Sequence, residues 1–167
     1  MCIRDRDVLV NNAGAAVADG EGRPSTVQLD TIQQTFDVNL YGTLRVTQAF
    51  LPLVQRASAG RIVNVSSTLG SVTTVASEGN PFGQMPFFAY PASKTVLNAL
   101  TAWLAVELKD TPIKVNSVCP GSNSTDMNPN PDAQHPAEGA KVVVRAATLA
   151  ADGPSGCFFD TNGAVAW

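Results

Sequence analysis

The 167-residue sequence is poor in the side chains that build metal sites, disulfide frameworks and nucleic-acid surfaces. It has three cysteines and one histidine, without metal-ligand spacing, so we expect neither a metal centre nor a disulfide scaffold. Eleven basic residues face 14 acidic ones, and the net charge of −3 offers no basic surface for nucleic acid or an anionic membrane. No apolar run approaches the roughly 18 residues of a membrane span. The sparse cysteines favour a soluble protein in a reducing, cytoplasmic setting.

Short β-branched runs alternate along the chain with longer stretches of helical periodicity. Strands are expected at residues 8–10, 61–66, 113–118 and 157–159, and helices at residues 29–54, 90–108 and 137–150. Residues 69–88 and 120–136 show no period and are expected to be loops. Alternation in this order predicts an α/β fold with a parallel sheet and helices on both faces.

In sheets of this kind, ligands bind beyond the carboxyl ends of the strands. Three of the predicted strands are followed by residues 11–14, 66–70 and 120–125, which are mostly small, polar or glycine residues. We therefore expect these segments to form the floor of a functional cleft.

Tyr90 and Lys94 are four residues apart at the start of a predicted helix, so they share one of its faces. A tyrosine has a pKa of about 10, and a neighbouring ammonium group lowers that pKa because it favours the phenolate. Such a pair can give a proton to a carbonyl oxygen or take one from an alcohol. The spacing alone is weak evidence, because most such pairs are solvated neighbours on a helix surface.

Other polar residues fall where they can complete this site. Ser66 and Ser67 end a predicted buried strand, where a hydroxyl either caps the strand or hydrogen-bonds a substrate oxygen. Asn39 lies within an apolar helical stretch, and an unpaired buried amide costs about 1–3 kcal/mol. Its side chain is expected either to bond to backbone or to hold a water. Pro120-Gly121, followed by Thr125, predicts a rigid turn that ends in a hydroxyl.

Taken together, these motifs resemble the short-chain dehydrogenase/reductase family. The matching segments are Asn11-Asn12-Ala13-Gly14, Asn39, Asn64-Val65-Ser66-Ser67 with Gly70, Tyr90-Pro91-Ala92-Ser93-Lys94, and Pro120-Gly121 with Thr125. The resemblance covers residues 7–167, and the last segment looks like the carbonyl-reductase-like branch. It implies the C-terminal part of a single Rossmann-type domain, a partial doubly wound parallel sheet whose first βαβαβ half is missing.

The resemblance also implies roles for individual residues. Tyr90 would be the general acid/base, and Lys94 would lower its pKa and hold the nicotinamide ribose. Ser67, rather than Ser66, would position the carbonyl, and Asn39 would hold a water of a proton relay. The remaining cofactor contacts would come from Asn12, Ala13, Gly14, Pro120, Gly121, Asn123 and Thr125. The cofactor would be NADP or NAD, with NADPH slightly favoured, and the substrate a small carbonyl compound or alcohol.

The sequence departs from the family pattern in three places. Residues 1–6 do not fit and are interpreted as a spurious start on a truncated gene, and no G-x-x-x-G-x-G turn occurs in the chain. We therefore expect weak or no cofactor binding by this chain, and an exposed edge at residues 8–10. An insertion at residues 75–87 resembles that of monomeric carbonyl reductases and favours a monomer. Asn123 stands beside Ser122 where the family has an apolar residue.

Two further questions stay open at this level. Phe82, Met85, Phe87 and Phe88 either form an apolar wall for a substrate or pack the insertion on itself. The chain is either an NAD(P)(H)-dependent oxidoreductase or a non-catalytic remnant or scaffold that keeps the catalytic residues. A sugar-nucleotide epimerase or dehydratase shares Tyr-x-x-x-Lys, but the Asn-Asn-Ala-Gly turn and the short C-terminal region argue against it.

Overall fold

The computed structural model describes residues 7–17 and 22–167, so the expected non-family start at residues 1–6 lies outside the described residues. Its centre is a four-stranded sheet made of β1 (Val8–Asn11), β2 (Arg61–Val65), β3 (Lys114–Val118) and β4 (Cys157–Phe159). The strands lie in the order β1-β2-β3-β4, and every neighbouring pair is parallel. The predicted parallel α/β architecture, as part of a Rossmann-type sheet, is therefore confirmed.

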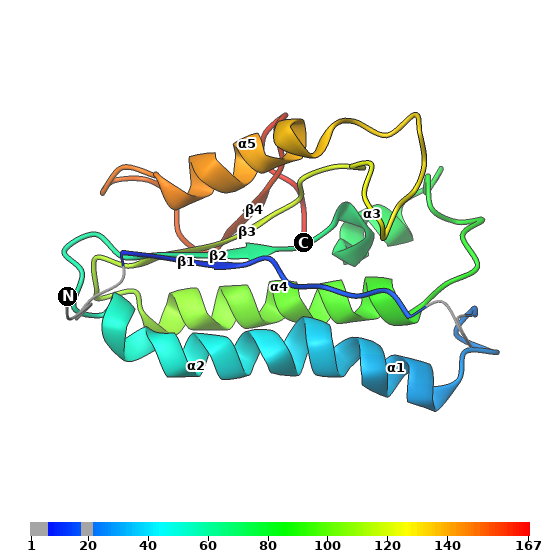
Figure 1. The fold of residues 1–167 in the computed structure, drawn as a ribbon, viewed down its shortest axis with the longest axis horizontal. Helices are drawn as coiled ribbons and strands as arrows, with labels where there is room; N and C mark the ends of the chain where they lie inside the picture. The colour runs from blue at the N-terminus through cyan, green and yellow to red at the C-terminus, as the bar shows by residue number, and fades with distance from the viewer. Residues whose placement is uncertain (1–6, 18–21) are drawn as a thin grey trace.

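Helices cover both faces of this sheet (Figure 1). On one face lie α1 (Leu29–Phe36), α2 (Thr43–Val54) and α4 (Ala89–Glu107), and on the other lies α5 (Pro136–Ala147). Because alternate strand residues point to opposite faces, β2 supplies both cores. Ile62 packs into the cluster with α2 and α4, whereas Val63 packs into the cluster with α5.

The helical stretch predicted at residues 29–54 is interrupted in its middle. A π-helical segment, η1 (Asp37–Gly42), joins α1 to α2. Hydrophobic periodicity does not reveal the switch from α-helical to π-helical hydrogen bonding, because the apolar residues stay on one side of the helix through the π segment. Single-turn π segments of this kind are frequent at functional sites, and here the segment contains the fully buried Asn39.

The prediction of an unstructured loop over residues 69–88 is wrong for its first part. A 3₁₀ turn, η2 (Thr68–Gly70), and a short helix, α3 (Val72–Ala76), follow β2 directly. The Ser67 and Ser71 hydroxyls cap these turns by accepting the backbone N–H groups of Leu69 and Thr74 at 3.2 and 3.1 Å. Elements this short show no hydrophobic periodicity in the sequence, so the capping serines are the only sequence feature that indicates them.

A row of hydrogen-bonded buried polar side chains connects the sheet to the helices that pack on one of its faces. The Asn11 side-chain amide donates to Thr47 Oγ1 at 3.0 Å and to Asn64 Oδ1 at 2.8 Å. The Asn64 amide in turn donates to Thr101 Oγ1 at 2.8 Å, and Thr101 is 2.8 Å from Ser117 Oγ. The row crosses β1, β2 and β3 and reaches α2 and α4. Because every member has a partner, the row fixes the positions of the strand ends that carry the site.

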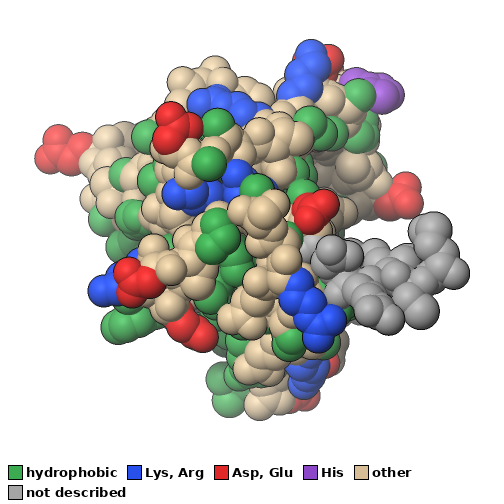
Figure 2. Space-filling model, turned by 90° about the vertical axis from the view of Figure 1, so that its left-hand side faces the viewer, with side chains coloured by type: hydrophobic (Ala, Val, Ile, Leu, Met, Phe, Trp, Pro, Cys, Tyr) green, Lys and Arg blue, Asp and Glu red, His purple; other side chains and the backbone are tan. Residues whose placement is uncertain are grey.

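Two observations concern the helices and the charged side chains at the surface. Among the described residues, no helix is long and apolar enough to cross a membrane. On the face seen in Figure 2, at the end where the strands begin, acidic and basic side chains are interspersed rather than gathered by sign. That face therefore presents no single-sign field of the kind that steers nucleic acids.

Candidate active site

The segments that follow β1, β2 and β3 all lie at the carboxyl end of the sheet, at the right of Figure 1. This is the arrangement expected from the sequence, and it brings three segments far apart in the chain to one edge. Helix α4 begins at the same end, so Tyr90 and Lys94 in its first turns lie beside the segment after β2.

Tyr90 and Lys94 share one face of α4, as their spacing predicts. The Lys94 ammonium nitrogen lies 5.5 Å from the centroid of the Tyr90 ring and donates a hydrogen bond to the Val65 carbonyl at 2.8 Å. That bond fixes the ammonium against the end of β2. Lys94 is only 3% exposed, which makes it a structured part of the site rather than a surface lysine.

Burial, rather than Lys94, dominates the pKa of Tyr90. Loss of hydration raises the pKa of Tyr90 above 10.0, the electrostatic interaction with Cys119 raises it further, and a hydrogen bond with the Ser67 side chain lowers it. The expected lowering by Lys94 is therefore wrong for the structure as it stands. The reason is that loss of hydration around the phenol is the largest influence on the pKa of Tyr90.

The same burial acts in the opposite direction on Lys94. Desolvation lowers the pKa of Lys94 to about 8 from 10.5, and the electrostatic interaction with Cys119 acts in the opposite direction. The amine therefore titrates close to neutral pH. Groups whose pKa values approach the working pH are the ones suited to taking up and releasing protons.

The two serines after β2 point in different directions. Ser67 hydrogen-bonds Tyr90 through its side chain, and its hydroxyl oxygen also accepts the Leu69 N–H. The Ser66 hydroxyl lies 3.5 Å from the Lys94 carbonyl oxygen and is buried against α4. The structure thus brings Ser67, and not Ser66, to the phenol.

Cys119 also belongs to this cluster, although no motif in the sequence singled it out. Its Sγ accepts the backbone N–H of Thr68 at 3.3 Å, and its electrostatic interaction with the Tyr90 phenol and the Lys94 amine raises the pKa of both. Its position between β3 and Pro120, at the carboxyl end of a strand, is the signal that could have identified it.

Asn39 connects the segment after β1 with α4. Its Oδ1 accepts the Ala15 N–H at 2.7 Å, and its amide donates to the Ala15 carbonyl and to Ser93 Oγ, each at 2.9 Å. The Asn39 side chain is therefore fully engaged with protein groups. A Cβ placed on Gly14 would lie 3.5 Å from Asn39 Oδ1 and 3.4 Å from Lys94 Nζ, so both groups border the same small space beside Gly14.

Gly70 allows the segment after β2 to press against α4. A Cβ at this position would lie 2.7 Å from the Lys94 carbonyl carbon and 2.8 Å from its Cβ, closer than side chains tolerate. The glycine therefore permits direct backbone contact between the turn that holds Ser67 and the helix that holds Lys94.

The other expected cofactor residues lie at the same end of the sheet but differ in how they are held. Asn12 and Ala13 are exposed after β1, and Thr125 is exposed in the loop after β3. Gly121 adopts a φ of +76°, which glycine tolerates without strain, and Pro120 precedes it. The Asn123 amide, by contrast, donates to the Pro120 and Gly121 carbonyls at 3.1 and 3.0 Å, so it braces its own loop.

The insertion encloses a cavity of about 520 Å³ against the start of α4. Phe82, Met85, Phe87 and Phe88 all line it, and Leu69 and Pro91 are among the other residues of its wall. The four apolar side chains are thus gathered around one space, next to the residues that follow Ser67 and Tyr90. Within the described part of the chain, no group of three or more His, Cys, Asp or Glu residues is placed to hold a metal ion.

A parallel α/β sheet that gathers Tyr90, Lys94 and Ser67 at the carboxyl ends of its strands is a Rossmann-type arrangement. Residues 3–136 match the sequence profile of the family described as short chain dehydrogenase. The chain belongs to that family.

Related proteins support this assignment. Salutaridine reductase of Papaver bracteatum is 33% identical over 93% of this chain, and a (+)-neomenthol dehydrogenase of Capsicum annuum is 32% identical over 83% of it. The chain covers 69% and 54% of those two proteins. Among solved structures, the carbonyl reductase Sniffer of D. melanogaster superposes with a TM-score of 0.83 at 28% identity, covering 99% of this chain and 68% of that one.

A second solved structure, the NADPH-bound carbonyl reductase from chicken fatty liver, superposes with a TM-score of 0.82 at 25% identity. It matches 98% of this chain, and the chain spans 66% of it. The chain thus corresponds to roughly half to two thirds of the proteins it matches.

Proposed function

We propose that the protein containing this chain is an NAD(P)(H)-dependent oxidoreductase that interconverts a ketone or aldehyde and the corresponding alcohol. The observation that carries the proposal is the contact between the Ser67 hydroxyl and the Tyr90 phenol, beside a buried Lys94. A phenol that keeps its proton until it is needed, and a serine that orients the substrate oxygen against it, form a general-acid centre.

The residues around Gly14 are suited to a nicotinamide cofactor. Gly14 leaves the side of Lys94 Nζ open where any Cβ would begin to fill it. The ammonium group has three donors and spends one on the Val65 carbonyl, so it can also bond ribose hydroxyls. Lys94, Tyr90 and the segments at residues 12–14 and 120–125 would hold the cofactor, which as NADPH or NADH supplies the hydride.

In the proposed reduction, Ser67 donates a hydrogen bond to the substrate carbonyl oxygen and Tyr90 transfers its phenolic proton to that oxygen. In the reverse direction Tyr90 accepts the proton of the alcohol. Lys94, whose pKa is about 8, restores the proton balance of Tyr90, and we propose that a water near Asn39 connects Lys94 to solvent.

The cavity formed by the insertion supports an apolar substrate. Three phenylalanines and Met85 line a space of about 520 Å³, within the size range of small-molecule pockets. A pocket of this kind favours a carbonyl compound or secondary alcohol with a substantial hydrocarbon body over a small charged acid. The Asn80 side chain in the wall hydrogen-bonds the Val75 carbonyl and the Phe82 N–H, so it holds the insertion in shape.

Replacing Tyr90 by phenylalanine tests the proposed acid. Tyr90→Phe in the complete protein should lower kcat by about 10²-fold or more, because proton transfer is lost, while NADPH binding stays nearly unchanged. Tyr41→Phe is the matched control, since Tyr41 is exposed and should retain full activity. Retention by Tyr90→Phe of more than a few per cent of the NADPH-dependent carbonyl reduction would show that Tyr90 is not the acid.

A further inference from the structure

The short helix α3 forms part of the wall of the substrate cavity, the space of about 520 Å³ enclosed by the insertion, through Val72 and Val75. None of the five residues of α3 is buried. A helix of this length is not stable by itself in water, so contacts with other parts of the chain must hold it. The position of this part of the cavity wall therefore depends on what holds α3.

Two hydrogen bonds connect the start of α3 to the last residues of the chain. The Thr73 N–H donates to the Trp167 carbonyl at 2.9 Å, and the Ser71 hydroxyl donates to the Ala166 carbonyl at 2.8 Å. The first N–H groups of a helix have no partner inside it, and the Trp167 carbonyl satisfies one of them. The buried Ser71 hydroxyl also accepts the Thr74 N–H, so one side chain links the helix cap to the C-terminal segment.

The C-terminal segment, residues 164–167, is in turn held by the sheet. The Val165 N–H donates to the Phe158 carbonyl at 2.8 Å, and the Trp167 ring stacks on the Phe158 ring with centroids 5.7 Å apart. Phe158 belongs to β4 and is only 2% exposed, so it is a fixed point of the core. The segment therefore connects α3 to the centre of the fold.

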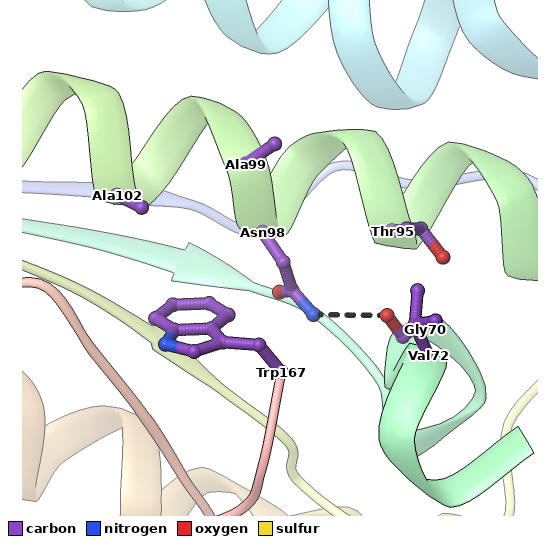
Figure 3. A pocket seen from close by; sticks show the side chains of 7 residues that line it. All are labelled: Gly70, Val72, Thr95, Asn98, Ala99, Ala102 and Trp167. Atoms are coloured by element: carbon purple, nitrogen blue, oxygen red, sulfur yellow. Dashed lines mark hydrogen bonds between the residues drawn. The ribbon is translucent and has the colours of Figure 1, made fainter. Parts of the chain in front are cut away.

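Trp167 and α3 also border a small space beside α4 (Figure 3). In Figure 3 the Trp167 indole and Val72 lie on either side of the Asn98 side chain, and all three residues line this space of about 210 Å³. Val72 and Thr95 line the substrate cavity as well. The small space gives Val72 room to move, so the contacts made by the C-terminal segment decide where this part of the wall stands.

We propose that residues 164–167 determine which substrates fit the cavity, with Trp167 as a positioning residue. Trp167 is not among the described residues that line the substrate cavity, so it acts through α3. Its ring holds the segment on Phe158, and its carbonyl holds the Thr73 N–H. Because α3 borders the space for the hydrocarbon body, bulky ketones should depend on Trp167 and small ones should not. The inference rests on the function proposed above, since it takes this cavity as the substrate site.

Hydrogen exchange at the Thr73 amide of the 167-residue chain tests the positioning step. Trp167→Ala removes the stack on Phe158 and should speed this exchange roughly fivefold, the effect of losing an aromatic pair. Trp167→Phe keeps an aromatic ring and should restore most of the protection. Trp103→Ala is the matched control, because Trp103 is 73% exposed and lines neither space. Exchange no faster in Trp167→Ala than in Trp103→Ala would overturn the proposal.

A second variant keeps the test decisive if Trp167→Ala does not fold. The Asp160 side chain accepts the N–H groups of Asn162 and Gly163, at 2.7 and 3.0 Å, in the turn that leads to the C-terminal segment. Asp160→Ala loosens this turn without changing the indole or the cavity wall, so it should also speed exchange at Thr73. Asp160→Asn keeps an acceptor and is the control. Equal exchange at Thr73 in these two variants would contradict the proposal.

The selectivity step is measured in the complete protein, with NADPH and either cyclohexyl methyl ketone or acetone. Trp167→Ala should raise KM for the cyclohexyl ketone roughly fourfold, the loss of about one buried methylene contact, and leave KM for acetone and both kcat values within about twofold. An unchanged ratio of the two KM values would overturn the proposal, even with faster exchange at Thr73.

Failure of the proposed function gives a different result. In that case the wild-type protein reduces neither ketone, and the affinity for cyclohexyl methyl ketone, measured by calorimetry, replaces KM. Trp167→Ala should lower this affinity by the same factor, whereas an unchanged affinity would show that Trp167 does not position the cavity wall.

Discussion

Lys94 holds an ammonium group where burial works against its charge. Loss of hydration lowers the pKa of Lys94 to about 8, and the electrostatic interaction with Cys119 offsets only part of this effect. Burying the ammonium group of Lys94 lowers the stability of the fold, so we infer that the residue is kept for function. In the proposed reaction its role is to carry protons and to bind ribose hydroxyls.

The lowered pKa of Lys94 predicts that the stability of the fold depends on pH in the alkaline range. The folded state loses the Lys94 proton near pH 8, whereas the unfolded state keeps it until about 10.5. The unfolded state therefore binds more protons between these values, and the free energy of unfolding should rise by about 2 kcal/mol between pH 8 and 10. Above pH 10 the raised pKa of Tyr90 acts in the opposite direction, because the folded state then keeps a proton that the unfolded state has lost.

Urea unfolding followed across this range measures the effect. Lys94→Met should flatten the rise between pH 8 and 10, and Lys109→Met, at an exposed position just after α4, should not. A rise of the same size in Lys94→Met would assign the pH dependence to another group.

At the residue scale, sequence reasoning located the groups but not their electrostatics. Tyr90, Lys94 and Ser67 are placed together by strand ends and helical spacing, both of which are legible in the sequence. The pKa direction of Tyr90 was wrong, because burial and the neighbour Cys119 are tertiary facts. Cys119 itself was missed, since a lone buried cysteine has the same sequence signature as an apolar filler.

At the scale of elements, the contact between η2 and α4 depends on Gly70. Gly70→Ala would push a methyl group into the Lys94 backbone, which cannot move without shifting the helix. We expect a loss of stability of about 1–3 kcal/mol, the usual cost of overpacking, measured as the free energy of unfolding in urea. Gly83→Ala is the control, because the nearest atom to its added Cβ is 3.5 Å away. Equal stability of the two variants would contradict the close approach of turn and helix.

The π segment η1 is the second element whose geometry carries the site. Asn39→Leu would leave the Ala15 N–H and carbonyl without their partner, so it should cost about 2–3 kcal/mol and speed hydrogen exchange at Ala15. Asn39→Asp keeps an acceptor for the Ala15 N–H and should protect that amide better than Asn39→Leu does. Identical exchange at Ala15 in the two variants would show that the Asn39 side chain does not hold this segment.

The order and type of the long elements followed from the sequence because each buries a periodic apolar face. The elements that the sequence did not predict are those that bury no periodic apolar face. Helix α3 has only five residues, which is too short for a periodic pattern. The π segment η1 lies within a helical stretch whose apolar residues continue on one side, so the pattern does not reveal it. Both elements lie next to the candidate site, where their local structure positions Ser67 and Asn39 and contributes little to the apolar core.

At the scale of the whole molecule, the sheet has one strand whose outer side lacks a partner among the described residues. β1 pairs only with β2, and Val8 and Val10 are 40% and 38% exposed. Open strand edges with exposed β-branched residues promote pairing between chains. The 167-residue chain should therefore self-associate as its concentration rises, which sedimentation velocity detects.

A charge on this strand should suppress the self-association. Val10→Lys should shift the chain toward a monomer without changing its circular dichroism, because a lysine on an edge strand disfavours pairing with a second edge. Val46→Lys is the matched control: Val46 is similarly exposed, at 42%, but it lies on the helix α2 and not on the edge strand. If both variants reduced association equally, net charge would be the cause. If neither did, the contact between chains would lie elsewhere than at β1.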